Sequence, residues 1–234
     1  MAAAIFERLV DDLSKESFFE DYKYLKSKSR FVLQKGDDIL YIINLSRRWA
    51  NGLGDLILIP SFGVRYESIT KWTEKFSCKR VSDFKNYYNV GYSLGMLTGV
   101  EEIRLNLVGE GYFELYPIIR DTIKACASYV FSRYDSLKHY FEYDILPKIE
   151  GRMNLRSDCG DWAFSYLAAC KLVAPQLYPK LKKMIMDKID EMYLYFNGRK
   201  IRDGYAALYD GRWEEIFDYL ENTDIANLPK RRKK

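Results

Sequence analysis

The sequence predicts an α+β protein, with an N-terminal helix, an antiparallel sheet of about four to six strands and then a helical C-terminal half. Three observations support this. Apolar residues recur at three- and four-residue steps near the N-terminus, dense β-type apolar runs follow, and helical spacing returns after Gly111. Strands that come before helices, instead of alternating with them, are typical of α+β folds.

The first predicted element is a helix over about residues 3–27. Ile5, Leu9 and Leu13 share one helical face, and aromatic residues continue the same spacing up to Tyr22. The period then changes to an alternation of apolar and polar residues. The sequence Gly-Asp-Asp at 36–38 predicts a turn between two strands.

Two long apolar runs, Ile39–Leu45 and Leu56–Tyr66, flank a short stretch with two glycines. This stretch is predicted to be a hairpin loop, because glycine supplies positive φ and a strand pattern follows. A phosphate-binding loop would instead need a helix that begins directly after the glycines. Pro60 predicts an edge strand or a bulge in the second run, because proline cannot donate to a neighbouring strand.

Short elements are predicted next, and helices continue from residue 111 to the end. Ile69, Trp72 and Phe76 mark one face of a short helix, and residues 87–97 and 101–108 are strand candidates. The predicted helices cover residues 115–130, residues 134–146 before Pro147, residues 162–173 before Pro175, residues 177–196 before Asn197-Gly198, and residues 213–220.

The domain organisation predicted from these elements has three parts. Residues 1–110 form an α+β sheet layer, residues 111–229 a helical part packed on the sheet or following it, and residues 230–234 a basic tail. The net charge is +4, and without the five tail charges it is 4 − 5 = −1. A nearly neutral body gives no reason to expect nucleic acid or membrane binding. The tail is expected to be a solvated terminus; the alternative is a nucleic-acid contact through Lys230, Arg231, Arg232, Lys233 and Lys234.

Cysteine usage and the N-terminus predict a cytoplasmic protein. None of the four cysteines forms a CxxC pair, and Cys126 and Cys170 lie in apolar helical patterns that suit free buried thiols. Acidic residues appear early, at Glu7 and Asp11, and no long apolar segment accompanies them, so no signal peptide is expected. No run reaches the ~20 apolar residues of a membrane span.

The sequence holds few of the residues that catalytic and metal-binding motifs need. His139 is the single histidine, which excludes zinc sites that use two histidines, and we expect it on a partly exposed helix. Asp83 and Lys85 have an acid-x-Lys spacing that, with Asp55, would suit a metal-dependent nuclease. Such triplets are common where 30% of residues are charged, so chance is favoured. No cofactor or metal site is predicted.

A binding patch is predicted at the end of the first long strand. Arginine and tryptophan often anchor protein interfaces, and Arg47, Arg48 and Trp49 follow one another there. Arg65 and Tyr66 at the end of the next strand are added to this patch, on an exposed sheet face or rim. The resulting hypothesis is a non-catalytic intracellular protein that binds another protein. The alternative is a nucleic-acid-binding protein or nuclease.

The order of the segments "ILYIINLSRR", "LILIPSFGVRY" and "FELYPIIRDTIKACASYVFSRYDS" resembles uncharacterised bacterial families known as domains of unknown function. These families have a hairpin-rich α+β layer with trailing helices, and some members lie beside polymorphic toxins as immunity proteins. The resemblance extends to about residue 140. It implies no catalytic residues. It implies a cytoplasmic protein that binds another protein, in one form by masking a toxin.

Overall fold

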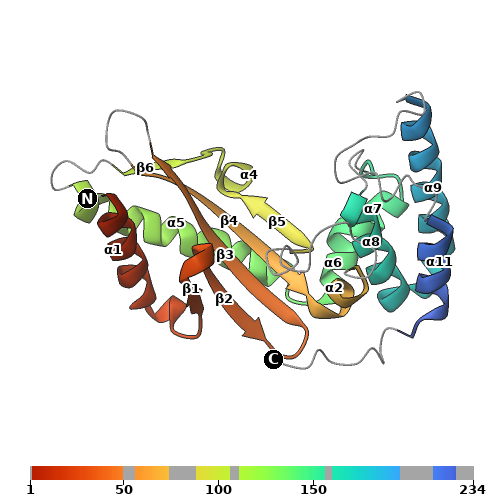
Figure 1. The fold of residues 1–234 in the computed structure, drawn as a ribbon, viewed down its shortest axis with the longest axis horizontal. Coiled ribbons are helices and arrows are strands. Elements are labelled where there is room, and N and C mark those ends of the chain that lie inside the picture. Colours follow the sequence, from red (N-terminus) through yellow and green to blue (C-terminus); the bar gives the residue numbers. More distant parts are fainter. Residues whose placement is uncertain are drawn as a thin grey trace. The chain divides into compact units, whose positions relative to one another are not determined.

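A computed structural model describes residues 2–49, 56–73, 88–105, 111–155, 160–195 and 213–224. The chain divides into two compact units. The first, called the sheet unit, comprises Met1–Arg65 and Val90–Asp135. The second, called the helical unit, comprises Tyr66–Asn89 and Ser136–Lys234. The predicted α+β class is confirmed: an N-terminal helix and an antiparallel sheet precede a helical C-terminal half (Figure 1).

The sheet unit contains helices α1 (Ala2–Ser14), α4 (Leu94–Thr98) and α5 (Gly111–Arg133). Its described sheet has six strands in the order β1-β2-β3-β4-β5, and β6 also pairs with β4. The domain boundary predicted after residue 110 stays a prediction, and by its contacts α5 groups with the sheet. The strands are β1 (Lys23–Leu25), β2 (Arg30–Lys35), β3 (Ile39–Trp49), β4 (Leu56–Tyr66), β5 (Val90–Ser93) and β6 (Ile103–Leu105).

The turn predicted at residues 36–38 joins β2 to β3. The two strands pair antiparallel from Lys35 opposite Ile39 to Arg30 opposite Asn44. Gly36 has a φ of +62°, a left-handed conformation that glycine adopts without the steric cost a side chain would add. The composition of this turn therefore fixes the register of the pair.

The N-terminal helix is shorter than predicted. α1 ends at Ser14, and the residues up to 27 form short 3₁₀ turns and β1. The aromatic side chains that continued the helical spacing pack against one another and against the sheet. The ring centroids of Phe19 and Phe31 lie 4.6 Å apart, and those of Phe18 and Tyr22 5.7 Å apart. Aromatic packing on β2 thus replaces the last helical turns.

Pro60 does not mark an edge strand, and that part of the prediction is wrong. β4 lies between β3 and β5 in the sheet. On one side, β6 pairs with Leu56–Leu58 and β5 pairs with Ser61–Val64. Pro60 falls between these two pairings, where its missing N–H removes no bond to either strand.

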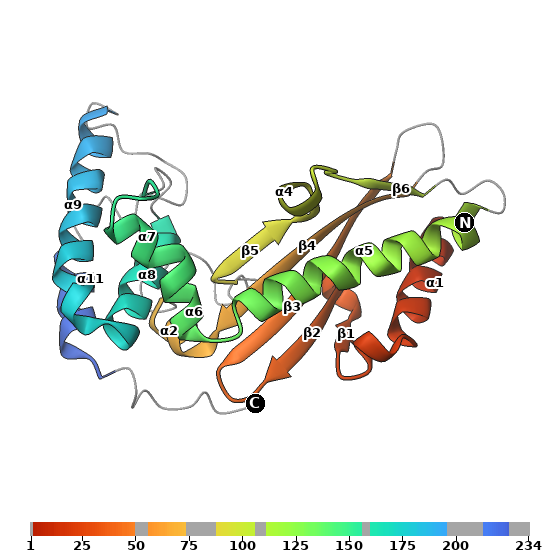
Figure 2. The same ribbon diagram turned by 180° about the vertical axis from the view of Figure 1, so that it is seen from behind.

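Helix α5 covers one face of the sheet, as Figure 2 shows. Tyr41 of β3 stacks on Phe131 of α5 with 4.4 Å between ring centroids, and its hydroxyl donates to the Phe131 carbonyl at 3.3 Å. Ile43 and Leu45 follow Tyr41 at two-residue steps on the same strand face, and both are fully buried. These residues form the core between β3 and α5.

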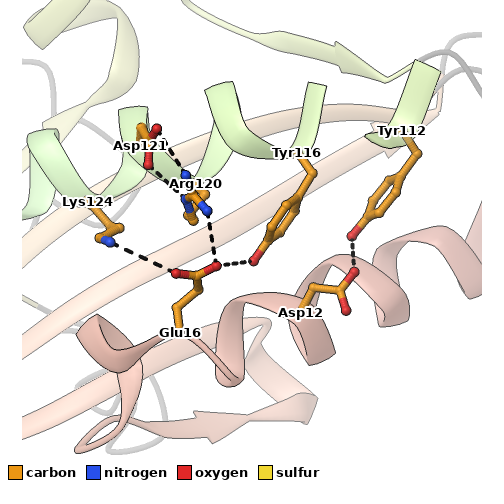
Figure 3. Close-up of polar contacts among 7 residues, drawn as sticks. All are labelled: Asp12, Glu16, Tyr112, Tyr116, Arg120, Asp121 and Lys124. Carbon is orange, nitrogen blue, oxygen red and sulfur yellow. Dashed lines mark hydrogen bonds and ion pairs between the residues drawn. The ribbon is translucent and has the colours of Figure 1, made fainter. Parts of the chain in front are cut away.

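Polar side chains join α1 to α5 (Figure 3). The Tyr112 hydroxyl donates to Asp12 at 2.7 Å. One turn further along α5, the Tyr116 hydroxyl donates at 3.0 Å to the carboxylate of Glu16, which lies two residues beyond the end of α1 and also accepts from Arg120 at 3.4 Å. The four-residue spacing places the α5 members of this set on one face of that helix. We call this set the α1–α5 seam: Asp12, Glu16, Tyr112, Tyr116, Arg120 and Lys124.

The helical unit is built around α8 (Gly160–Val173), whose residues 163–170 are all buried. A helix buried on every side is a central one. Pro147 was predicted to end a helix, but it lies in the first turn of α7, directly after a π-helical turn at Phe141–Ile145. A proline is tolerated in the first turn of a helix because the N–H groups there have no partner within the helix. The helical path therefore continues through Pro147. The other elements are α2 (Glu67–Thr73), α6 (Leu137–Tyr140), α7 (Leu146–Ile149), α9 (Tyr178–Tyr195) and α11 (Trp213–Asn222).

The predicted helix end at Asn197-Gly198 lies outside the described residues. Among the described helices, none is both long and apolar enough to span a membrane.

The α1–α5 seam generates a stability prediction. Tyr112→Phe removes the hydrogen bond to Asp12, and a double-mutant cycle with Asp12→Asn should give a coupling of about 1 kcal/mol in the free energy of unfolding. Urea denaturation measures it. Asp11→Asn is the matched control, because Asp11 is an exposed neighbour with the same charge. Additive effects of Tyr112→Phe and Asp12→Asn would contradict the prediction.

Candidate protein interface

The structure divides the predicted binding patch between the two faces of the sheet. Arg47 and Arg48 are neighbours on β3, so their side chains project to opposite faces. The Arg47 guanidinium lies 3.8 Å from the centroid of the Phe6 ring of α1. Arg48 instead forms an ion pair with Glu102. Trp49 is the last residue of β3, and its side chain lies outside the described part of the structure.

Arg65 and Tyr66 are buried, so their predicted place on an exposed face or rim is wrong. Arg65 is 6% exposed and Tyr66 is fully buried. The Tyr66 ring stacks on Tyr140 at 5.4 Å, and its hydroxyl donates to the Ser136 carbonyl at 3.2 Å. Residue type alone suggested a binding role, whereas Tyr66 contributes to the packing of the helical unit.

Arg48 shares its carboxylate partner with a second arginine. Arg104 of β6 donates to one oxygen of Glu102 from Nε at 3.0 Å and from Nη2 at 2.9 Å. Arg48 donates to the other oxygen through its Nη2. The two arginine side chains are 62% and 63% exposed, whereas that of Glu102 is 21% exposed. We call these three residues the Arg48–Glu102–Arg104 cluster.

The cluster carries one net positive charge. Hydrogen bonds from Arg48 and then from Arg104 hold the pKa of Glu102 below its usual value. Glu102 is therefore a carboxylate at neutral pH, and its charge cancels that of one arginine. Because it holds both guanidinium groups, Glu102 also restricts their side-chain rotamers.

A compact turn precedes Glu102 and Arg104 in the chain. The Ser93 hydroxyl accepts from the Met96 N–H at 3.2 Å and caps the start of α4. Gly99 ends α4 with a φ of +78°. A Cβ added to Gly95 would lie 3.2 Å from the Cα of Glu101, so glycine permits the close approach of this backbone. The residues before β6 are thus held against α4.

This turn exposes two apolar side chains. Met96 is 60% exposed and Val100 is 55% exposed. Val100 precedes Glu102 by two residues, so their Cα atoms lie within about 7 Å of each other. We call the combined set the α4–β6 surface: Arg48, Met96, Val100, Glu102 and Arg104.

Sequence reasoning identified only Arg48 in this surface. The segment 101–108 was predicted as a strand, and its alternating charges at Glu102 and Arg104 are the signal that could have drawn attention to it. No local pattern predicts that Arg48, far away in the chain, lies next to Glu102.

A second exposed apolar set lies on α5. Phe113 is 66% exposed, Ile118 61% and Tyr129 54%. The Arg8 guanidinium lies 4.5 Å from the centroid of the Phe113 ring. The α1–α5 seam holds the face of α5 opposite Ile118 against α1. The orientation of α5 about its own axis is therefore fixed, and Ile118 stays exposed.

The remaining residues predicted to carry chemistry are those of the nuclease alternative, the basic tail and His139. Asp55, Asp83, Lys85 and the tail 230–234 lie outside the described residues. Within the described ranges, no three His, Cys, Asp or Glu side chains are grouped so that they could hold a metal ion. His139 is half-buried on α6, as predicted.

Cys126 and Cys170 are free and buried, which confirms that prediction. Burial raises the pKa of Cys126, and it raises that of Cys170 to about 12. A thiol with such a pKa is almost entirely protonated at neutral pH, so neither cysteine is poised as a nucleophile.

Comparisons with protein-family models, with curated proteins and with solved structures found no match. The resemblance to bacterial domains of unknown function therefore stays a prediction.

The Arg48–Glu102–Arg104 cluster predicts a measurable titration. The pKa of Glu102, followed by carboxyl-carbon NMR, should lie below the usual value of a glutamate and should rise in Arg48→Gln or Arg104→Gln. Since the folded-state pKa is lowered, the cluster's stabilisation is present above the unfolded pKa and is lost as pH falls through the folded one.

Arg47→Gln is the control for this titration, because Arg47 lies on the opposite face with the same charge. A Glu102 pKa that responds equally to Arg47→Gln and Arg48→Gln would show general electrostatics instead of the specific hydrogen bonds.

Proposed function

We propose that this protein is a non-catalytic binding protein and that it recognises another protein through the α4–β6 surface. The observation that supports the proposal is the combination of two exposed arginines, held by one glutamate, with exposed Met96 and Val100 on the segment that leads into that glutamate. Arginine and methionine are enriched at protein interfaces relative to the rest of protein surfaces.

The arrangement reduces two costs of association. Glu102 restricts both arginine side chains before a partner arrives, so less rotamer freedom is lost on binding. The turn that carries Met96 and Val100 is closed by the Ser93 cap and the contact between Gly95 and Glu101. Exposed ion pairs by themselves contribute little, so burial of the two apolar side chains supplies the main driving force.

The finer parts of the hypothesis belong to the same proposal. In this finer form of the proposal, the protein is cytoplasmic and its partner is a toxin. Binding masks the toxin, as the resemblance to immunity proteins implies. The alternative, a nucleic-acid-binding protein or metal-dependent nuclease, rests on Asp55, Asp83, Lys85 and the basic tail, which lie outside the described residues. That alternative remains a prediction.

Photo-crosslinking tests the proposed surface. With benzoylphenylalanine in place of Val100, the protein expressed in its source cells should form one discrete protein adduct. Met96→Glu should abolish that adduct, because a charge at the interface core would be desolvated. Met153→Glu is the matched control, since Met153 is also an exposed methionine, at 51%, but belongs to the helical unit.

Crosslinkers at Ile118 and at Asp38 complete the experiment. An adduct at Ile118 without one at Val100 would move the interface to α5 and contradict the α4–β6 surface. An adduct that is equally strong at Asp38, a half-buried residue of the turn between β2 and β3, would show non-specific capture.

A further inference from the structure

We infer that the Arg48–Glu102–Arg104 cluster is a receptor for a carboxylate group, so that the bound protein presents an acidic side chain next to an apolar one. This inference rests on the proposed function and specifies the chemistry of the partner. It concerns one segment type, in which an Asp or Glu contacts the arginines while its apolar neighbour contacts Val100.

The two arginines keep donors that Glu102 does not use. A guanidinium has five N–H groups in a planar fork. Arg104 uses its Nε and one Nη2 hydrogen on Glu102, and Arg48 uses one Nη2 hydrogen. In the described part of the chain these are the hydrogen bonds that the two groups make, so donors remain on side chains that are 62% and 63% exposed.

The shape of the remaining donors suits a carboxylate. A guanidinium edge presents two parallel N–H groups that match the two oxygens of a carboxylate. Glu102 does not take up this match, because Nε and Nη2 of Arg104 both donate to one of its oxygens and Arg48 donates to the other. A second carboxylate would meet the outer sides of the same two groups.

The charge of the cluster favours a single carboxylate over a polyanion. The cluster has one net positive charge, so one bound carboxylate neutralises it. Glu101 is exposed directly beside Glu102 and would repel further negative charge. A nucleic-acid backbone repeats its charges and needs a row of cations. Exposed Val100 adds apolar contact that a protein segment can use.

Arg47 supplies an internal control for the proposed site. It is adjacent to Arg48, carries the same charge and is also exposed. Its guanidinium lies over the Phe6 ring, on the other face of the strand. Non-specific attraction of an acidic peptide would depend on both arginines, whereas a built site depends on Arg48 alone.

The test uses a synthetic acetylated peptide of alternating leucine and glutamate, titrated at low salt into the full chain. Arginine Nε–Hε NMR signals of Arg48 and Arg104 should shift and saturate. Arg48→Gln and Arg104→Gln should each weaken binding about tenfold, the effect of losing a charge-assisted hydrogen bond, whereas Arg47→Gln should change it less than about twofold.

Glu102→Gln separates a positioning role from simple attraction. It makes the surface more positive, so attraction alone would strengthen binding. The inference expects weaker binding, because the two guanidinium groups lose the carboxylate that holds them. Circular dichroism of each variant checks that the fold is retained.

Three results would overturn the inference: equal losses in Arg47→Gln and Arg48→Gln, unchanged affinity for a peptide with glutamine in place of glutamate, or saturable binding of single-stranded DNA but not of the acidic peptide. A peptide that fails to bind while crosslinking at Val100 succeeds removes the carboxylate site and leaves protein binding intact. Peptide binding without any adduct at Val100 supports the carboxylate site and counts against the proposed function.

Discussion

Strand β3 presents successive side chains to opposite faces of the sheet, and the sheet unit is organised around this alternation. Tyr41 lies on the face that packs against Phe131 of α5, and Arg47, on the same face, meets Phe6 of α1. Asn44 and Arg48 lie on the other face, where Asn44 donates to Ser61 of β4 at 3.2 Å. The same period therefore separates a helix-covered core from the face that carries the arginine cluster.

The parts of the fold that follow from local chemistry could be predicted. The turn at Gly36 and the buried stripe of α8 are encoded by neighbouring residues. Errors arose where distant packing decided. Phe19 has a helical spacing but packs on Phe31. Pro60 is tolerated in a central strand because it lies between the segments of β4 that pair with β6 and with β5. A single sequence without relatives does not report such contacts.

The candidate interface shows the same limit. Residue type and strand position selected Arg48, but its partner Glu102 lies 54 residues further along the chain. Arg65 and Tyr66 have the side chains of an interface, yet they are buried. Burial depends on which elements pack against a strand end, and amphipathic side chains such as these serve in a core as well as on a surface.

The contact between Gly95 and Glu101 makes the link from α4 to β6 a spacer of fixed length. Gly99 ends α4, and the Thr98 hydroxyl accepts a hydrogen bond from the Val100 N–H at 3.1 Å. The backbone of this segment is therefore held at both ends and cannot take up an extra residue without moving β6. One inserted residue would shift β6 by a single step against β4 and turn Arg104 to the opposite face. Related chains that keep the arginine cluster should therefore tolerate exchanges of side chains in this segment far better than changes in its number of residues.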